Sequence, residues 1–100
     1  MIVECPGNVK VEITQRHKDC KAYYQKNVCG DNRAVVAYWH DPFLGGWRWS
    51  IDVSELYRPK EILVRGVICD NVEQCVIAAN DVIQTEHFRK MLSLWRAESL

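Results

Sequence analysis

The alternation of apolar and polar positions predicts β-strands in three parts of the chain. Residues 8–14 place apolar side chains on one face and polar side chains on the other, as in a half-buried strand. Residues 34–39 form a run rich in strand-forming residues, and residues 47–53 alternate strictly. The apolar members of the last run share one face, which is expected to be the core side: Trp47, Trp49, Ile51 and Val53.

Residues 40–46, with one proline and two adjacent glycines, predict a hairpin connection between the second and third of these strands. A fourth strand is predicted over Glu61–Cys69, and its near-continuous apolar character indicates a central position in the sheet. Residues 15–27 are polar and basic. Their pattern leaves a loop, a short helix and a further strand open.

A helix is predicted to begin at Asn71, where the Asp70 carboxylate can accept from the Glu73 amide and an amphipathic run follows. If that helix ran straight, the apolar residues after Thr85 would point about 170° away from the first apolar stripe. Therefore either the helix breaks near Thr85 or its last turns face another molecule. We favour a break followed by self-association into a homodimer through the second stripe: Phe88, Met91, Leu92 and Trp95.

Together these elements predict an α+β fold: a three- or four-stranded antiparallel sheet with one long or broken C-terminal helix packed on one face. The length of 100 residues, 48% of them hydrophobic, predicts a single domain over residues 1–100. The apolar runs are too short to span a membrane, so no membrane partner is expected. The odd number of cysteines, 5, and a start unlike a secretory signal favour a reducing cytoplasm.

The candidate chemical groups favour a non-catalytic protein without metal or cofactor. A zinc site built from His17, Cys20, Cys29 and His40 would lack any Cys-x2-Cys pair. The glycines at 45–46 lack the spacing and the lysine of a phosphate-binding loop. A small cysteine-dependent enzyme is the least favoured alternative, because a nucleophilic cysteine needs a histidine within hydrogen-bond reach.

Charge is balanced overall, with 13 basic and 13 acidic residues, but it is unevenly distributed. Residues 41–86 are predominantly acidic, whereas the Arg16–Lys26 segment is basic. This segment could contact a protein, or it could pair with phosphates and stack on bases in a nucleic-acid-binding regulatory protein. Its candidate binding residues are Arg16, Lys18, Lys21, Tyr23, Tyr24 and Lys26. The 4 Trp and 4 Tyr residues, common in interface hot spots, favour a protein partner first and nucleic acid second.

The strand Gly45-Gly-Trp-Arg-Trp-Ser-Ile-Asp52, followed by another strand and a capped helix, resembles small orphan α+β proteins of phages and mobile elements. Anti-CRISPR inhibitors are among them, and the likeness covers residues 34–84. It implies a viral protein for evasion of host defence that binds a Cas protein or effector complex stoichiometrically in the host bacterial cytoplasm. Many such inhibitors are strongly acidic, whereas this chain is neutral, which argues against mimicry of DNA.

Overall fold

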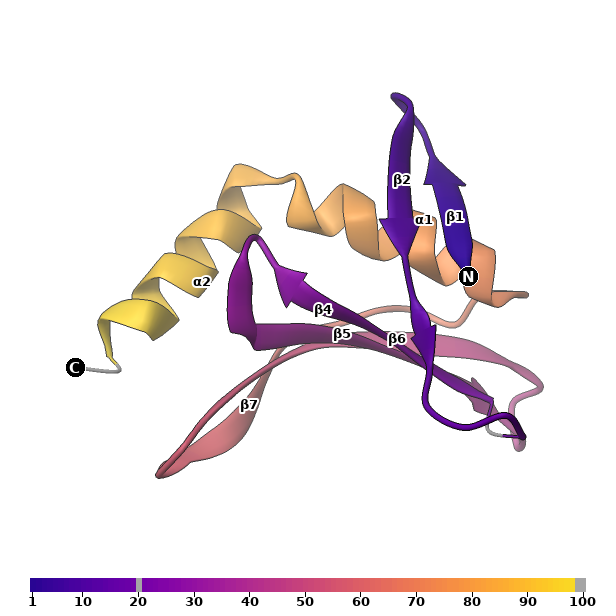
Figure 1. Cartoon of the computed structure of the whole chain (residues 1–100), viewed down its shortest axis with the longest axis horizontal. Coiled ribbons are helices and arrows are strands. Elements are labelled where there is room, and N and C mark those ends of the chain that lie inside the picture. The colour runs from indigo at the N-terminus through magenta and orange to yellow at the C-terminus, as the bar shows by residue number, and fades with distance from the viewer. Residues whose placement is uncertain (20, 99–100) are drawn as a thin grey trace.

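The computed structural model describes residues 1–19 and 21–98 and shows an α+β fold in which two helices lie on one side of a sheet (Figure 1). All the strands precede the helices along the chain. The elements are β1 (Ile2–Cys5), β2 (Val9–Glu12), β3 (Thr14–Gln15), β4 (Ala22–Val28), β5 (Asp31–Asp41), β6 (Gly46–Glu55), β7 (Arg58–Arg65), α1 (Val72–Ile83) and α2 (Glu86–Ala97).

The main sheet is antiparallel and five-stranded, in the order β3-β4-β5-β6-β7, so each strand pairs with its neighbour in sequence. A separate hairpin of β1 and β2 lies against α1, on the same side of the sheet as the helices (Figure 1). The predicted α+β class and antiparallel sheet are confirmed, but the predicted three or four strands were too few. Strand β1 was missed, and β4 occupies the region whose structure the sequence left open.

The strand expected over residues 61–69 is β7, and its predicted central position was wrong because β7 forms an edge of the sheet. The register between β6 and β7 shifts along the strand, so the apolar residues of β7 are divided between the two faces of the sheet. Leu63 and Val64 pack against the core, while Ile62, on the other face, remains 42% exposed. The strand ends at Arg65; the Gly66 amide still bonds to the Trp49 carbonyl of β6, and Cys69 pairs with Trp47 further along.

The core lies between the helices and one face of β5 and β6. As predicted, Trp49, Ile51 and Val53 are buried on this face, and Trp47 is half-buried at the end of the row. Three buried residues of β5 lie on the same side, and α1 covers them with its apolar stripe. These further core residues are Ala34, Val36 and Tyr38 of β5, and Val72, Cys75, Val76, Ala79 and Ile83 of α1.

The chain forms two helices, which confirms the predicted break near Thr85. The Thr85 hydroxyl caps α2 by accepting from the Phe88 amide at 3.2 Å. The cap of α1 lies one residue later than predicted, because Asn71 rather than Asp70 accepts, from the Gln74 amide at 2.9 Å. The Gln74 side chain reaches back and accepts from the Asp70 amide at 3.1 Å, one residue before the cap, in a variant of the capping box.

The break turns the second apolar stripe back onto the domain's own core. Phe88, Leu92 and Trp95 are 1%, 1% and 2% exposed, and Met91 is half-buried. The expected exposure of this stripe as a self-association surface was therefore wrong. The turn at residues 84–85 reorients α2, so both stripes meet the same core.

Gly66 closes the core where β7 ends. Its amide donates to the Trp49 carbonyl at 2.9 Å, and a Cβ at this position would overlap the Trp49 indole ring. The backbone approaches the indole so closely that only glycine fits. Gly66 thus allows the backbone at the end of β7 to lie directly against the Trp49 ring.

We expect Gly66→Ala to lower the free energy of unfolding by about 1–3 kcal/mol, because the added methyl group must displace a buried indole. Urea denaturation followed by circular dichroism measures this change. Ser93→Ala, at an exposed position of α2, is the control and should shift stability by less than about 0.5 kcal/mol. Unchanged stability of Gly66→Ala would contradict the packing of Trp49 against Gly66.

Candidate functional site

The face of the main sheet that is turned away from α1 and α2 is covered by neither helix (Figure 1). We call it the open face. Strand register places alternate residues of β4 to β7 on it. One row across the strands consists of Tyr24, Ala37, Ser50 and Arg65, and the next row contains Ala22, Trp39 and Arg48.

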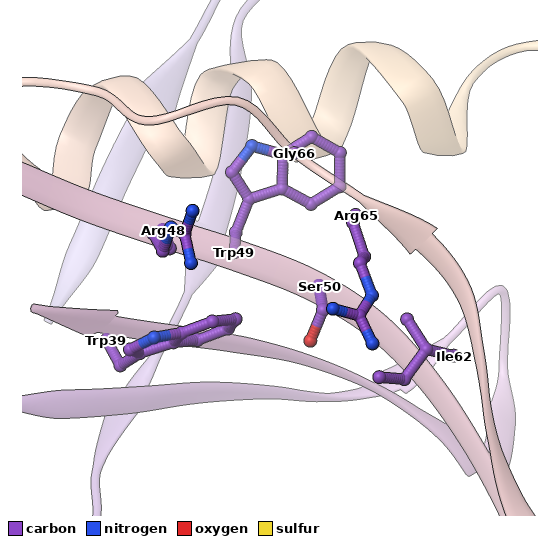
Figure 2. Close-up of a pocket in the computed structure, with 7 residues that line it drawn as sticks. All are labelled: Trp39, Arg48, Trp49, Ser50, Ile62, Arg65 and Gly66. Carbon is purple, nitrogen blue, oxygen red and sulfur yellow. The ribbon is translucent and has the colours of Figure 1, made fainter. Parts of the chain in front are cut away.

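The open face contains a pocket of about 240 Å³. It lies at the small residue Ser50, which pairs with Ala37 across the face and is surrounded by larger side chains. Figure 2 shows Trp39 and Arg65 on the same side of β6 as the Ser50 hydroxyl, with the Trp49 ring on the opposite side, towards the helix. The pocket is lined by Trp39, Arg48, Trp49, Ser50, Ile62, Arg65 and Gly66.

Three side chains give this pocket the character of an anion site. Arg48 and Arg65 come from adjacent strands, and Arg65 makes no ion pair with any described residue. Ser50 is 4% exposed, and within the described chain its hydroxyl has no hydrogen-bond partner. The pocket therefore presents two guanidinium groups and a hydroxyl donor that solvent can reach.

Arg48 is partly compensated by Asp41, whose carboxylate lies 3.7 Å from it. Hydrogen bonds from the Leu44 and Phe43 amides, together with the charge of Arg48, hold the pKa of Asp41 below its usual value. The ionised Asp41 closes the β5–β6 turn and fixes one wall of the pocket. Much of the Arg48 side chain, 45%, nevertheless remains exposed.

Four exposed apolar residues lie at the same end of the sheet as the pocket, and we call them the tip surface. Its residues are Phe43, Leu44, Val67 and Ile68, which are 96%, 63%, 80% and 42% exposed. Ile68 lies over Gly46, since a Cβ there would be 2.6 Å from Ile68 Cγ1. Strand alternation gives Gly46 the same face as Arg48, so Ile68 borders the open face beside the pocket.

The basic segment predicted to bind a partner does not form one surface. In β4, Tyr24 and Lys26 lie on the open face, whereas Tyr23 faces the helix side, where its ring centroid is 6.1 Å from that of Trp47. The other three basic residues are exposed in or beside the 16–21 connection: Arg16, Lys18 and Lys21. Sequence reasoning missed the pocket, because its walls come from three strands whose register only the fold supplies.

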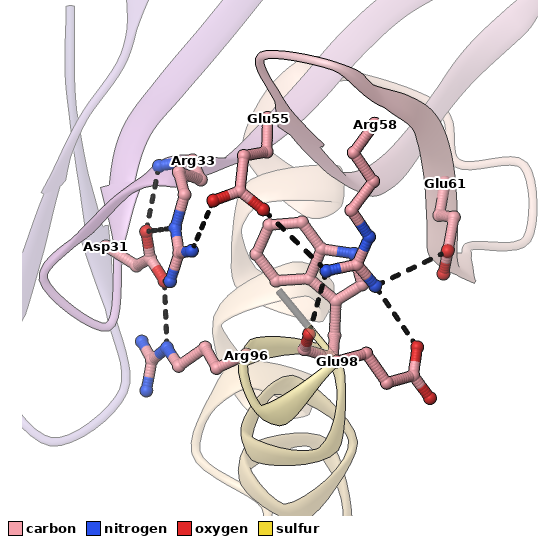
Figure 3. Close-up of polar contacts among 8 residues, drawn as sticks. Asp31, Arg33, Glu55, Arg58, Glu61, Arg96 and Glu98 are labelled. Carbon is pink, nitrogen blue, oxygen red and sulfur yellow. Dashed lines mark hydrogen bonds and ion pairs between the residues drawn. The ribbon is translucent and has the colours of Figure 1, made fainter. Parts of the chain in front are cut away.

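A second polar cluster surrounds Trp95 at the end of α2 (Figure 3). The Arg33 and Arg58 guanidinium groups lie 4.9 and 4.4 Å from the centroid of the indole ring. Arg58 also donates to the Trp95 carbonyl at 2.9 Å and to Glu98 at 3.1 Å. These contacts hold the last turn of α2 against the β6–β7 hairpin.

Asp31 anchors the other side of this cluster. Its buried carboxylate accepts from Arg33 and, at 2.8 Å, from Arg96 of α2. The Arg33 hydrogen bonds, reinforced by Arg96, hold the pKa of Asp31 well below its usual range. Arg33 also reaches Glu55 at 3.1 Å. Arg33, Arg58 and Asp31 of this cluster contact α2 or its cap directly, so we assign it a structural role.

The cysteine thiols bear on the enzyme alternative. Cys5 and Cys75 are buried, and burial together with a hydrogen bond to Cys69 raises the pKa of Cys75. The protonated thiol of Cys75 is unlike the thiolate that a nucleophilic cysteine requires, whereas Cys29, next to Gly30, is exposed. The described residues contain no cluster of three metal-ligating side chains. Cys20, from the zinc set weighed above, lies outside the described residues.

We expect the ionised Asp31 to make stability pH-dependent. Because its pKa is lower in the folded chain, its contribution is present above the unfolded-state pKa of about 3.9 and is lost as pH falls below it. The urea midpoint should therefore fall between about pH 5 and pH 2. Asp31→Asn should lower the midpoint at pH 7 and flatten this dependence, whereas Glu4→Gln, at an exposed position, should do neither. Parallel profiles for parent and Asp31→Asn would contradict the assignment.

Within the described residues, no helix is long and apolar enough to cross a membrane. The chain matches no protein-family model, and neither a curated protein nor a solved structure is detectably similar to it.

Proposed function

We propose that the protein is a non-catalytic binding protein that contacts a protein partner through the tip surface and the adjoining pocket. The observation that carries this proposal is the exposure of Phe43, Leu44 and Val67 beside Trp39 and two arginines. A folded domain seldom exposes such apolar groups together without an interaction to make. Aromatic and arginine side chains are also enriched in interface hot spots.

The resemblance to phage inhibitors supports a specific form of this proposal. The protein would inhibit a bacterial defence system in the host cytoplasm by stoichiometric binding to a Cas protein or effector complex. Such inhibition needs a surface and no reaction. The arginines beside the tip surface suit an acidic patch on that partner.

Nucleic-acid binding is the second candidate, and the position of β4 favours it. Tyr24 and Lys26 lie on the open face, with Arg65 in the same row as Tyr24. An aromatic side chain with cations around it can stack a base and pair with its phosphate. In this case the open face, rather than the tip surface, would carry the affinity.

We expect a Phe43→Ser, Val67→Ser double variant to lose partner binding by at least about tenfold, since truncating a hot-spot residue typically costs more than 1 kcal/mol. The tagged protein is used as bait in a bacterial lysate, and bound proteins are quantified by mass spectrometry and titrated after purification. Leu94→Ser is the matched control, because Leu94 is 60% exposed on α2, outside the tip surface. Equal losses in both variants would contradict a role for the tip surface.

Filter binding with single- and double-stranded RNA and DNA across a salt series tests the second candidate. Phosphate contacts weaken steeply with salt. We expect only weak binding of all four nucleic acids at physiological salt. Tight, salt-dependent binding that Lys26→Gln reduces and the tip double variant leaves intact would replace the protein partner by nucleic acid.

A further inference from the structure

We propose that the open-face pocket is the anchor of this interface and takes the carboxylate side chain of an aspartate or glutamate from the protein partner. This inference rests on the proposed function and specifies the chemistry at its centre. The pocket is formed by Trp39, Arg48, Ser50, Ile62 and Arg65 on the side away from the helices (Figure 2).

The two guanidinium groups provide the charge for a single carboxylate. Arg48 is shared with Asp41 at 3.7 Å, and Lys60, further along the face, is paired with Asp52 at 3.3 Å. Arg65 makes no such pair among the described residues. One incoming carboxylate would therefore balance the charge at the pocket, with Arg65 as its main partner and Arg48 as the second.

Ser50 adds a neutral hydrogen-bond donor to the two cations of the pocket. Its hydroxyl is directed to the pocket, where it makes no hydrogen bond to the described chain and is open to solvent. A carboxylate oxygen at the pocket floor would accept this hydrogen bond. A buried ion pair needs such additional donors to offset the loss of hydration.

Size favours a single side chain. A volume of about 240 Å³ corresponds to roughly eight water molecules at liquid density, which is less than a typical small-molecule site holds. The aliphatic part of a glutamate would lie along Trp39 and Ile62. The pocket would thus admit one acidic residue while the surrounding surface contacts its neighbours.

The surroundings favour a protein carboxylate over the phosphates of a nucleic acid. Ile68 of the tip surface lies over Gly46, two residues before Arg48, and apolar groups offer a phosphodiester backbone no favourable contact. They would instead cover apolar residues beside the acidic residue of a protein and exclude water from the ion pair. A nucleic-acid strand needs a series of cations along its path, whereas Arg65 in β7 and Lys26 in β4 are separated by the two strands between them.

A peptide titration tests this proposal without the natural partner. The probes are N-acetyl-Glu-Leu-amide and its Gln counterpart, added to the full chain while the side-chain Nε–Hε signals of arginine are followed by NMR. We expect the Glu peptide to shift the Arg48 and Arg65 signals saturably and to bind at least about fivefold more tightly than the Gln peptide. The signal of Arg89, which is exposed on α2, should not move. Equal binding of the two peptides, or an equal shift of Arg89, would overturn the carboxylate site.

Variants separate the pocket from general charge effects. Arg65→Gln and Ser50→Ala should each weaken binding of the Glu peptide by at least about threefold, whereas Arg89→Gln should leave it unchanged. Unfolding curves establish that each variant folds. An effect of Arg89→Gln as large as that of Arg65→Gln would overturn the site. Tighter binding of inorganic phosphate or an octathymidylate strand than of the Glu peptide would also overturn it, in favour of a phosphate ligand.

The proposal for the pocket and the proposal for the wider interface can be rejected independently. If Arg65→Gln leaves binding of the purified partner intact while the tip double variant abolishes it, the interface remains and the carboxylate anchor is rejected. If the Glu peptide binds as expected but the tip double variant retains full partner binding, the anchor remains and the tip surface is rejected.

Discussion

Burial of one side of β6 beneath two helices is the constraint on which the rest of this structure depends. Trp49, Ile51 and Val53 supply much of the apolar surface on that side. The stripes of both helices are buried in the core on this side of the sheet, together with the β1–β2 hairpin, so the turn at Thr85 must bring α2 back to the same side. The opposite side of β6 is then left without a helical cover, and its alternating polar residues become the floor of the open face.

Local patterns predicted the hairpin between β5 and β6, the inward row of β6 and the helix break, because each depends on residues close in sequence. The features that the sequence did not predict depend on contacts between residues far apart in the chain. The apolar run of β7 resembled a central strand, but its bulges divide its apolar residues between two faces. The second helix stripe appeared available for a partner until the fold placed Trp95 between Arg33 and Arg58.

The candidate site also depends on contacts between residues that are far apart in the sequence. Tyr24 and Lys26 could be named from the basic character of their segment, yet strand alternation separates them from Tyr23. The pocket could not be named, because it exists only where small residues of β5 and β6 pair between larger ones. That the Ser50 hydroxyl lines this pocket depends on strand register, which a serine in a sequence pattern does not reveal.

The order of the elements affects how the protein is made. Every strand of the main sheet is synthesised before α1 and α2, and the consecutive hairpins can pair by local contacts alone. Until residues 72–97 follow, however, the row of Trp49, Ile51 and Val53 has no cover. A nascent sheet with this face exposed is a target for chaperones and for aggregation. Formation of α2, which is held to the sheet through Trp95 and Asp31, is therefore the step that completes the cover of this apolar face.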